Sequence, residues 1–258
     1  MKQFTHLITA AALVTIVSGC AQEAGTSSLK MLLGNAAVTK PENPISQAVT
    51  PAPTFSDGNT TFTITEAQVN VRNVILDDAN GSAQHTVNGP FMLDLLTGNA
   101  TPNTITFEPP AATYTRIDVR VDQANVEDNL VPAGDAMLGN SIRISGTYAT
   151  TTPSAQGKFT IMFGLTEDIR FEPTGGIAID DENSANIVLK MDVTDWLVDP
   201  ANSTTVDLSA CMSTYLDTST VEDTTDVLID DNSGKTCSGV QIEKIIKSNM
   251  KNLYDFSS

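Results

Sequence analysis

Histidine and cysteine are scarce in this sequence, and that scarcity excludes several kinds of site. Only His85 lies beyond the first nineteen residues, and the three cysteines, Cys20, Cys211 and Cys237, are not clustered. Zinc and copper sites need clusters of such residues, and a catalytic triad needs a histidine beside its nucleophile. The motifs of serine hydrolases, zinc proteases, P-loop proteins and dinucleotide-binding proteins are absent too. We therefore expect His85 to be a surface residue without a catalytic role.

Basic and aromatic residues are also few. Fourteen lysines and arginines stand against 31 aspartates and glutamates, so the formal net charge is −17. That charge argues against nucleic acid as a partner and against flat contact with an anionic lipid surface. Aromatic residues make up 5% of the chain. Together with abundant threonine, serine, asparagine and aspartate, this composition is typical of secreted β proteins.

The apolar run near the start of the chain is too short to cross a membrane. It covers Leu7–Val17 after the basic Lys2, which is typical of a signal peptide, whereas a spanning helix needs roughly 20 apolar residues. Two small residues then lead directly into Cys20, and Val17–Cys20 resembles the lipobox of bacterial lipoproteins. The alternative is that Cys20 is an incidental residue after an ordinary signal peptide.

The lipobox resemblance implies a lipid anchor. Cleavage before Cys20 would leave diacylglycerol on its sulfur and an acyl group, such as palmitate, on its new amine. Each buried CH₂ contributes about 0.8 kcal/mol, so two or three acyl chains hold a soluble domain on a membrane. Ala21 stands where an aspartate would favour retention at the inner membrane in enterobacteria. We therefore expect a lipoprotein of the outer membrane, on its periplasmic face or at the cell surface.

Changes in composition divide the chain into four parts. Four prolines among small polar residues in the stretch before residue 58 indicate a flexible tether, although Ser28–Leu33 is an apolar island that forms either one helical turn or a docked strand. The predicted parts are a signal peptide at 1–19, a lipidated N-terminus and tether at 20–58, a β-sandwich domain at 59–199, and a disulfide-linked acidic segment with a terminal helix at 200–258.

Residues 61–197 alternate between apolar and polar side chains with the period of two that indicates β-strands. The apolar positions change parity between Ile64 and Ala67 and again between Val71 and Val74, and each change predicts a β-bulge or kink. About nine strands separated by turn signals predict an all-β fold, an antiparallel β-sandwich. Trp196 closes the last of these strands, so we expect it to be buried.

The last sixty residues contain two cysteines and the clearest helical pattern. In an oxidising compartment, Cys211 and Cys237 indicate a disulfide worth roughly 3 kcal/mol, with two free thiols or a redox pair as the alternatives. Residues 217–231 contain six acids and no base, and apolar residues at helical spacing over 242–253 predict an amphipathic helix. The lysines of this helix either pair with the acidic segment or are solvated while its apolar stripe packs on the sandwich.

Two short motifs carry a further resemblance. Leu93–Leu96 and Ala111–Ile117 are similar to the "LDLL" and "AGxYTxIRL" motifs of an uncharacterised bacterial lipoprotein domain family, and Thr65–Ala67 fits the first core strand of that family. The resemblance covers about residues 60–195. It implies a transthyretin-like or carbohydrate-module-like β-sandwich at the cell envelope and brings no catalytic residues.

Acidic turns offer the best oxygen ligands for a metal ion in this sequence. Asp180, Asp181 and Glu182 form one such turn, and Asp230 and Asp231 begin another. Calcium takes carboxylate and carbonyl oxygens from loops of this kind. These five residues are therefore candidate calcium ligands, with ordinary solvated turns as the alternative.

The sequence as a whole predicts a non-enzymatic cell-envelope lipoprotein with a binding or structural and assembly role. Its partners would be the membrane, through the lipid anchor, and an envelope protein or glycan. One alternative is a carbohydrate-binding or adhesive surface module, which requires exposed aromatic residues among Tyr114, Tyr148, Trp196 and Tyr215. Another is an envelope hydrolase, which requires paired carboxylates that converge in a cleft.

Overall fold

The computed structural model describes residues 27–34, 52–78, 80, 84–151, 154–180, 185–201, 203–216, 226–231, 234–250 and 253–257. In these ranges the chain forms two large sheets, a two-stranded ribbon, one α-helix near the C-terminus and two short 3₁₀ helices. The predicted all-β, sandwich-like fold with a C-terminal helix is confirmed. None of the helices within the described ranges has the length and apolarity of a membrane span.

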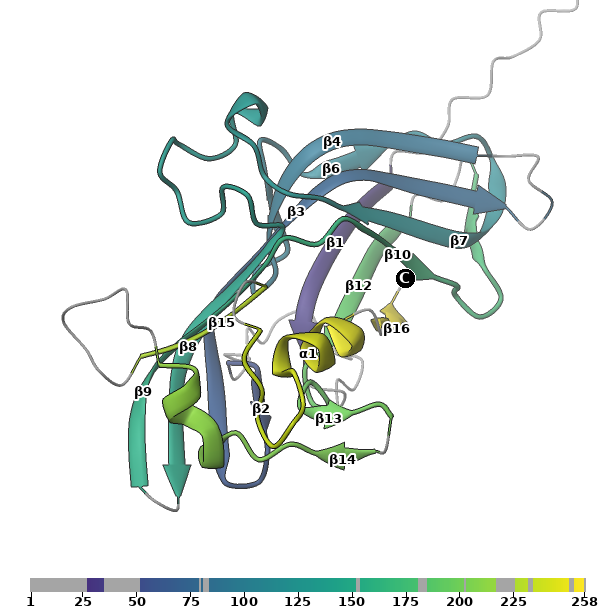
Figure 1. Cartoon of the computed structure of the whole chain (residues 1–258). Helices are drawn as coiled ribbons and strands as arrows, with labels where there is room; N and C mark the ends of the chain where they lie inside the picture. The colour runs from purple at the N-terminus through teal and green to yellow at the C-terminus, as the bar shows by residue number, and fades with distance from the viewer. Residues whose placement is uncertain are drawn as a thin grey trace, which may run out of the picture.

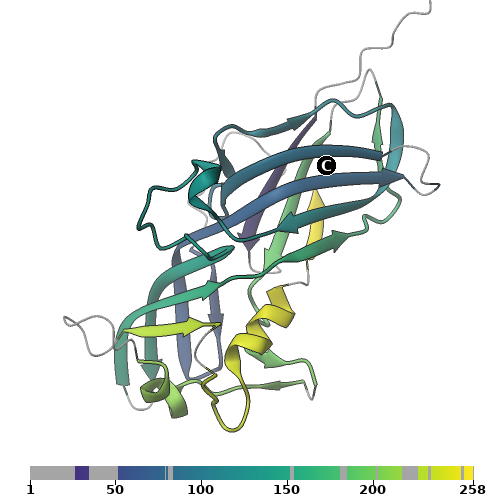
Figure 2. The ribbon, with the colours of Figure 1, turned by 45° about the horizontal axis from the view of Figure 1, so that its top comes forward.

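One long strand, β3, runs through the larger sheet from end to end (Figure 1). It covers Thr60–Asp78. On one edge β3 pairs first with β8 (Ile142–Thr151) and then with β7 (Ala112–Val121). On the other edge it pairs with β2 (Thr54–Ser56) and then with β4 (Gln84–Asp94). Figure 2 shows that β3 thereby joins two parts of an elongated molecule.

The remaining elements extend or cover this sheet. β9 and β15 continue it beyond β8, β10 and β11 pair with β7, β5 pairs with β4, and β13 and β14 form the separate ribbon. Their bounds are Asn99–Thr101 for β5, Ser154–Phe163 for β9, Glu167–Phe171 for β10, Ile177–Ile179 for β11, Val198–Asp199 for β13, Thr204–Thr205 for β14, Val227–Asp230 for β15, Val126–Asp128 for the 3₁₀ helix η1, Ser209–Thr214 for the 3₁₀ helix η2, and Ile242–Met250 for α1.

The smaller sheet has the order β16-β12-β1-β6. Its strands are β16 (Leu253–Ser257), β12 (Asn186–Asp192), β1 (Ser27–Gly34) and β6 (Ile105–Phe107). β1 runs parallel to β12, and β15 runs parallel to β9, so the sandwich is not purely antiparallel as predicted. Two parallel neighbouring strands need a long connection between them, and the two strands of each pair are indeed far apart in the chain.

The tether predicted for residues 20–58 is wrong in two places. β1 is a central strand of the smaller sheet, with Leu29 and Met31 each only 1% exposed, and β2 pairs with β3. Of the two alternatives for Ser28–Leu33, the docked strand is correct. The parallel partner of β1 is β12, which lies 158 residues later in the chain, so no local pattern could predict the pairing.

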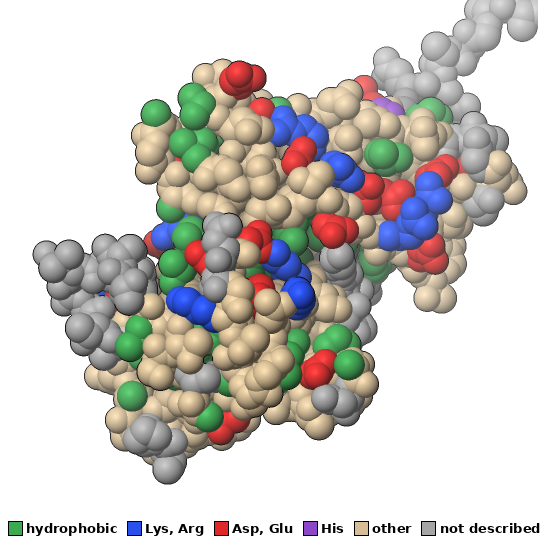
Figure 3. All heavy atoms as spheres, viewed as in Figure 1, with side chains coloured by type: hydrophobic (Ala, Val, Ile, Leu, Met, Phe, Trp, Pro, Cys, Tyr) green, Lys and Arg blue, Asp and Glu red, His purple; other side chains and the backbone are tan. Residues whose placement is uncertain are grey.

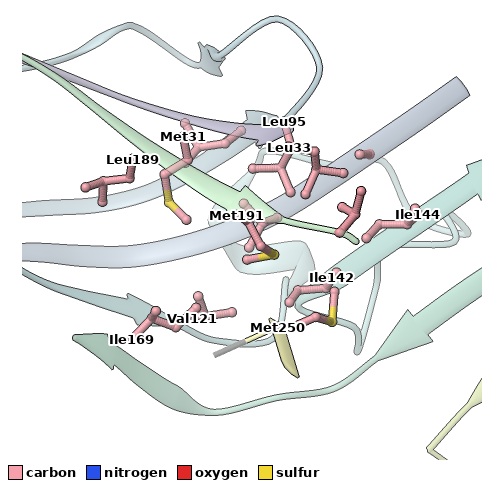
Figure 4. Close-up of a cluster of buried hydrophobic side chains, with 14 of the residues drawn as sticks. Met31, Leu33, Leu95, Val121, Ile142, Ile144, Ile169, Leu189, Met191 and Met250 are labelled. Carbon is pink, nitrogen blue, oxygen red and sulfur yellow. The ribbon is translucent and has the colours of Figure 1, made fainter. Parts of the chain in front are cut away.

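The two sheets enclose a continuous apolar core. Figure 4 shows Met31 and Met191 of the smaller sheet across from Val121 and Ile142 of the larger one. Burial of each such side chain contributes about 1.5–3 kcal/mol relative to its exposure. This core determines which face of every strand points inward, and therefore which residues remain on the outside.

An aromatic cluster closes the core near the start of β3. Phe55 and Phe62 stack with ring centroids 4.7 Å apart, and Phe159 meets Phe62 edge-on at 5.2 Å. Trp196 lies 5.4 Å from Phe55 and is completely buried. The predicted burial of Trp196 is therefore confirmed.

Both predicted irregularities in β3 are present. The register of β3 shifts between Ile64 and Glu66 against β8, and between Val71 and Asn73 against β4 and β7. Gly146 stands opposite the first shift, where a Cβ would lie 1.9 Å from the backbone oxygen of Thr63. Only glycine allows the two backbones to approach so closely.

The C-terminal residues belong to the sandwich and are not a separate unit, which corrects the predicted part at 200–258. β15 and β16 are strands of the two sheets, and α1 buries Ile242, Ile245 and Ile246. Both alternatives for the predicted helix hold in part. Its apolar stripe packs on the core, while the Lys247 ammonium pairs with the carboxylate of Asp231, the last residue of the acidic segment.

A buried polar network lies where β7 ends and β8 begins beside β3. The backbone N–H of Asn70 donates to the Ser141 carbonyl at 2.7 Å, and its side-chain amide donates to the Asp122 carbonyl at 2.9 Å. The Ser141 hydroxyl donates to the Phe163 carbonyl and accepts the N–H of Leu165 at 2.7 Å. Asn70 and Ser141 are both fully buried.

We predict that Ser141→Ala destabilises the fold by roughly 1–3 kcal/mol, because the buried N–H of Leu165 loses its acceptor. Urea unfolding followed by circular dichroism measures the effect. Ser145→Ala is the matched control, since the hydroxyl of Ser145 bonds to the exposed Glu66 carboxylate, and it should cost less than about 1 kcal/mol. Equal losses in the two variants would contradict the role assigned to the buried network.

Candidate functional site

Three adjoining hollows form a groove on the outer face of β3, β8 and β9, and we call it the hydroxyl groove. Their volumes are about 530, 410 and 460 Å³. The first and second hollows share Thr147 and Lys158, and the second and third share Thr65, Glu66 and Arg143. Because neighbouring hollows share lining residues, they form one continuous surface along the sheet.

The hydroxyls of the groove follow from strand alternation. Phe62 and Ile64 point into the core, so the residues between and beside them point outward. These outward positions hold threonines, whose branched side chains suit a strand. The threonines and the serine that line the groove are Thr61, Thr63, Thr65, Ser145, Thr147 and Thr160.

The first bulge of β3 supplies the charge at the centre of the groove. It leaves two consecutive residues, Thr65 and Glu66, exposed on the outer face. The Arg143 guanidinium lies 3.1 Å from the Glu66 carboxylate, which also accepts the Ser145 hydroxyl at 3.0 Å. The Glu66 side chain is 59% exposed, so it can still accept hydrogen bonds from a ligand.

The acids that border the groove also hold backbone groups. Asp226 accepts the N–H of Lys158 at 3.3 Å. Asp94 accepts the N–H of Leu96, and Asp135 accepts the N–H of Met137, both at 2.8 Å. These contacts fix the rim of the groove. They also give each of the three carboxylates a structural role.

One wall of the groove belongs to the long loop between β7 and β8, which contributes Asp135 and Ala136. The Arg72 guanidinium holds this loop through two bonds to the Asp128 carboxylate, at 2.8 and 3.1 Å. These bonds hold the pKa of Asp128 below its usual value, and Asp128 in turn raises the pKa of Arg72. Met137 packs with Met92 beneath the loop, so the wall is supported from inside.

A second polar face lies over β7 and β10, and its charges are paired with one another. Asp118 is buried and receives Arg116 and Arg170, each at 3.0 Å, while Arg120 pairs with Asp168. Figure 3 shows acidic and basic side chains interspersed over this side of the molecule. The charged side chains of this face therefore bond mainly to one another.

The four aromatic residues named as a sugar-binding platform are all buried. Tyr114, Tyr148, Trp196 and Tyr215 are each at most 4% exposed. The Tyr114 hydroxyl donates to the Pro110 carbonyl at 2.7 Å, and burial raises the pKa of this tyrosine and that of Tyr215. None of the four can stack on a ligand at the surface. His85 is half-buried in β4, with its ring 6.2 Å from that of Phe107.

The structure gives partial information on the residues predicted to bind a lipid or a metal. Cys20, Asp181 and Glu182 lie outside the described residues, while Asp180 follows β11. One carboxylate oxygen of Asp231 accepts the N–H of Gly164, and the other pairs with Lys247. In the part of the chain that the structure describes, no three histidine, cysteine or acidic residues cluster as a metal site. Calcium binding stays a prediction.

The groove itself was not identified from the sequence. The alternation of threonines with Phe62 and Ile64 is visible there, but the partners on β8 and β9 lie about 80 to 100 residues later. Comparison with protein families, curated proteins and solved structures finds no match to this chain. The resemblance carried by Leu93–Leu96 and Ala111–Ile117 therefore stays a prediction.

We predict that Asp128→Asn destabilises the protein by roughly 1–3 kcal/mol at neutral pH, since the mutation removes a charge-assisted pair. The pKa of the Asp128 carboxyl is lower in the folded state than the value of about 3.9 in the unfolded chain. The ionised carboxylate therefore stabilises the fold above about pH 3.9, and this stabilisation is lost as the pH falls through the pKa of the folded state. The difference from wild type should therefore shrink below about pH 4. Urea unfolding across this range tests it, with Asp168→Asn, in the exposed pair with Arg120, as control. A difference that does not change with pH would contradict the assignment.

Proposed function

We propose that this protein is a non-enzymatic lipoprotein of the cell envelope that binds a polar ligand in the hydroxyl groove. The groove carries the proposal because it is a continuous hollow lined by hydroxyls around one exposed ion pair, Glu66–Arg143. Such a surface offers donors and acceptors in alternation. It suits a ligand that is itself rich in hydroxyl or amide groups.

An envelope glycan fits this chemistry best. Sugar hydroxyls both donate and accept, so they can bond to threonine hydroxyls, to the Glu66 carboxylate and to the Arg143 guanidinium. Since Tyr148 contributes to the lining while 4% exposed, affinity would come from hydrogen bonds and not from stacking. We expect modest affinity per sugar unit and stronger binding to a polymer that fills all three hollows.

A binding role is better supported than hydrolysis by paired carboxylates. Glycosidases need two carboxyl groups free to act as acid and as base or nucleophile. The rim acids Asp94, Asp135 and Asp226 hold backbone N–H groups, and Glu66 is paired with Arg143. Each of these four acids thus already accepts a hydrogen bond or an ion pair from within the protein.

We predict that Glu66→Ala and Arg143→Ala each weaken glycan binding at least tenfold. A glycan array of neutral, acidic and amino sugars identifies the ligand, and titration calorimetry measures the affinity. Arg120→Ala is the matched control, because the Arg120–Asp168 pair has a similar exposure and distance but lies outside the groove. Exposed pairs contribute at most about 1 kcal/mol, so all three variants should fold. A wild type that binds no glycan, or a control as weak as the groove variants, would refute the proposal.

The proposal includes a disulfide between Cys211 and Cys237. Cys237 is completely buried, and its Sγ lies 3.3 Å from the carbonyl oxygen of Asp207, four residues before Cys211. The Tyr215 hydroxyl reaches the Lys235 carbonyl at 3.1 Å, so the two segments are neighbours at a second point. This proximity supports the pairing that an oxidising compartment would allow.

The proposal also places the protein at the outer membrane through Cys20. We predict that wild type partitions with the outer membrane and carries a diacylglyceryl mass, and that Cys20→Ser shows neither. Intact mass spectrometry and membrane fractionation test this. Alkylation in denaturant without reductant should leave Cys211 and Cys237 unmodified in the same preparations. If wild type and Cys20→Ser behave alike, the anchor is refuted, and alkylated cysteines would refute the disulfide.

A further inference from the structure

The position of β1 limits the length of any tether from Cys20. Six residues separate Cys20 from Ser27, the first residue of β1. An extended chain covers at most 3.3–3.6 Å per residue, so the seven steps span no more than about 25 Å. Ser27 is itself 1% exposed and bonded to Ala185, so the attachment point on the domain is fixed.

Ser27 lies at the end of the molecule where β3 terminates. Ser27 pairs with Phe107 of β6, and the Phe107 ring lies 6.2 Å from that of His85. His85 is the partner of Leu76, which is two residues from the end of β3. The start of β1 and the end of β3 are therefore at the same end of the molecule.

The first hollow of the hydroxyl groove lies near the opposite end of β3. It is lined by Thr61 and Thr63, fifteen and thirteen residues before Leu76. At about 3.3 Å per residue, Thr61 and Leu76 are separated by up to roughly 50 Å along the strand. This separation is about twice the greatest length of the tether.

We propose that the protein stands on the membrane through the β1 end and holds the Thr61 end of the groove away from the lipid. The inference rests on the proposed lipid anchor at Cys20. After removal of residues 1–19, which contain one lysine and no acid, the chain has a formal net charge of −18. That charge opposes a flat orientation on an anionic surface, so the short tether and the repulsion favour the same upright orientation.

Energy transfer to vesicles tests the orientation. A chain that begins at Cys20 is coupled to a cyanobenzothiazole lipid, which reacts only with an N-terminal cysteine, in phosphatidylcholine and phosphatidylglycerol vesicles with a headgroup acceptor dye. A donor dye is placed on an azide side chain at Thr106, the exposed partner of Ser28, or at Gln156, an exposed residue of the first hollow. Transfer from Thr106 should be at least twofold more efficient. Equal transfer from the two sites would overturn the proposal.

Two insertions of the same length locate the attachment. A 20-residue Gly/Ser linker between Glu23 and Ala24 adds roughly 25 Å of mean reach, so transfer from Thr106 should fall towards the value for Gln156. The same linker between Lys40 and Pro41 follows β1 and should change nothing. If both insertions reduce transfer equally, β1 is not the attachment point and the orientation is wrong. Chemical coupling does not need natural lipidation, so this result is independent of the Cys20→Ser experiment.

Discussion

The pairing of β3 with four different strands is the constraint on which the rest of the structure depends. Along one edge, β8 gives way to β7 at Asn70, and backbone groups at such a break would be left without partners in the core. Asn70 and Ser141 bond to the backbone groups of Asp122, Phe163 and Leu165 at this break, and the Asn70 carbonyl accepts the N–H of Asp122. The long loop between β7 and β8 begins and ends at this network. The hydrogen bonds that Asn70 makes to Asp122 and Ser141 therefore fix both ends of this loop, and the loop forms one wall of the groove.

The bulges of β3 connect the fold to the candidate site. A strand without irregularities presents every second residue to one face, and the register shift after Ile64 places Thr65 and Glu66 outside together. Gly146 allows the neighbouring strand to pass at this point. The exposed ion pair of the groove thus arises from the same local geometry that keeps Ile64 and Ala67 in the core. The bulge after Ile64 therefore contributes both to the packing of the core and to the proposed binding surface.

The proposed attachment point at the start of β1 lies near one end of β3, and the first hollow of the proposed binding surface lies near the other. Such an arrangement separates attachment from recognition without a long flexible linker, because the folded domain itself provides the distance. In this arrangement the attachment would act on β1, which is a central strand between β12 and β6. A terminal strand at the edge of a sheet would resist less if the chain were pulled from Cys20.

The sequence by itself determined the local features of this protein. Its period of two predicted the strands, the parity changes after Ile64 and Val71 predicted both bulges, and the place of Trp196 at the end of a core strand predicted its burial. These features depend on which face of a strand each side chain points to, and the alternation of apolar and polar residues along the chain shows this directly. The tertiary structure alone decided that β1 is a central strand, that Asp231 meets Lys247, and that the threonines of β3 form a groove with β8 and β9. Each of these joins residues far apart in the chain, and the choice among such partners is made by burial of the whole core, which no local pattern records.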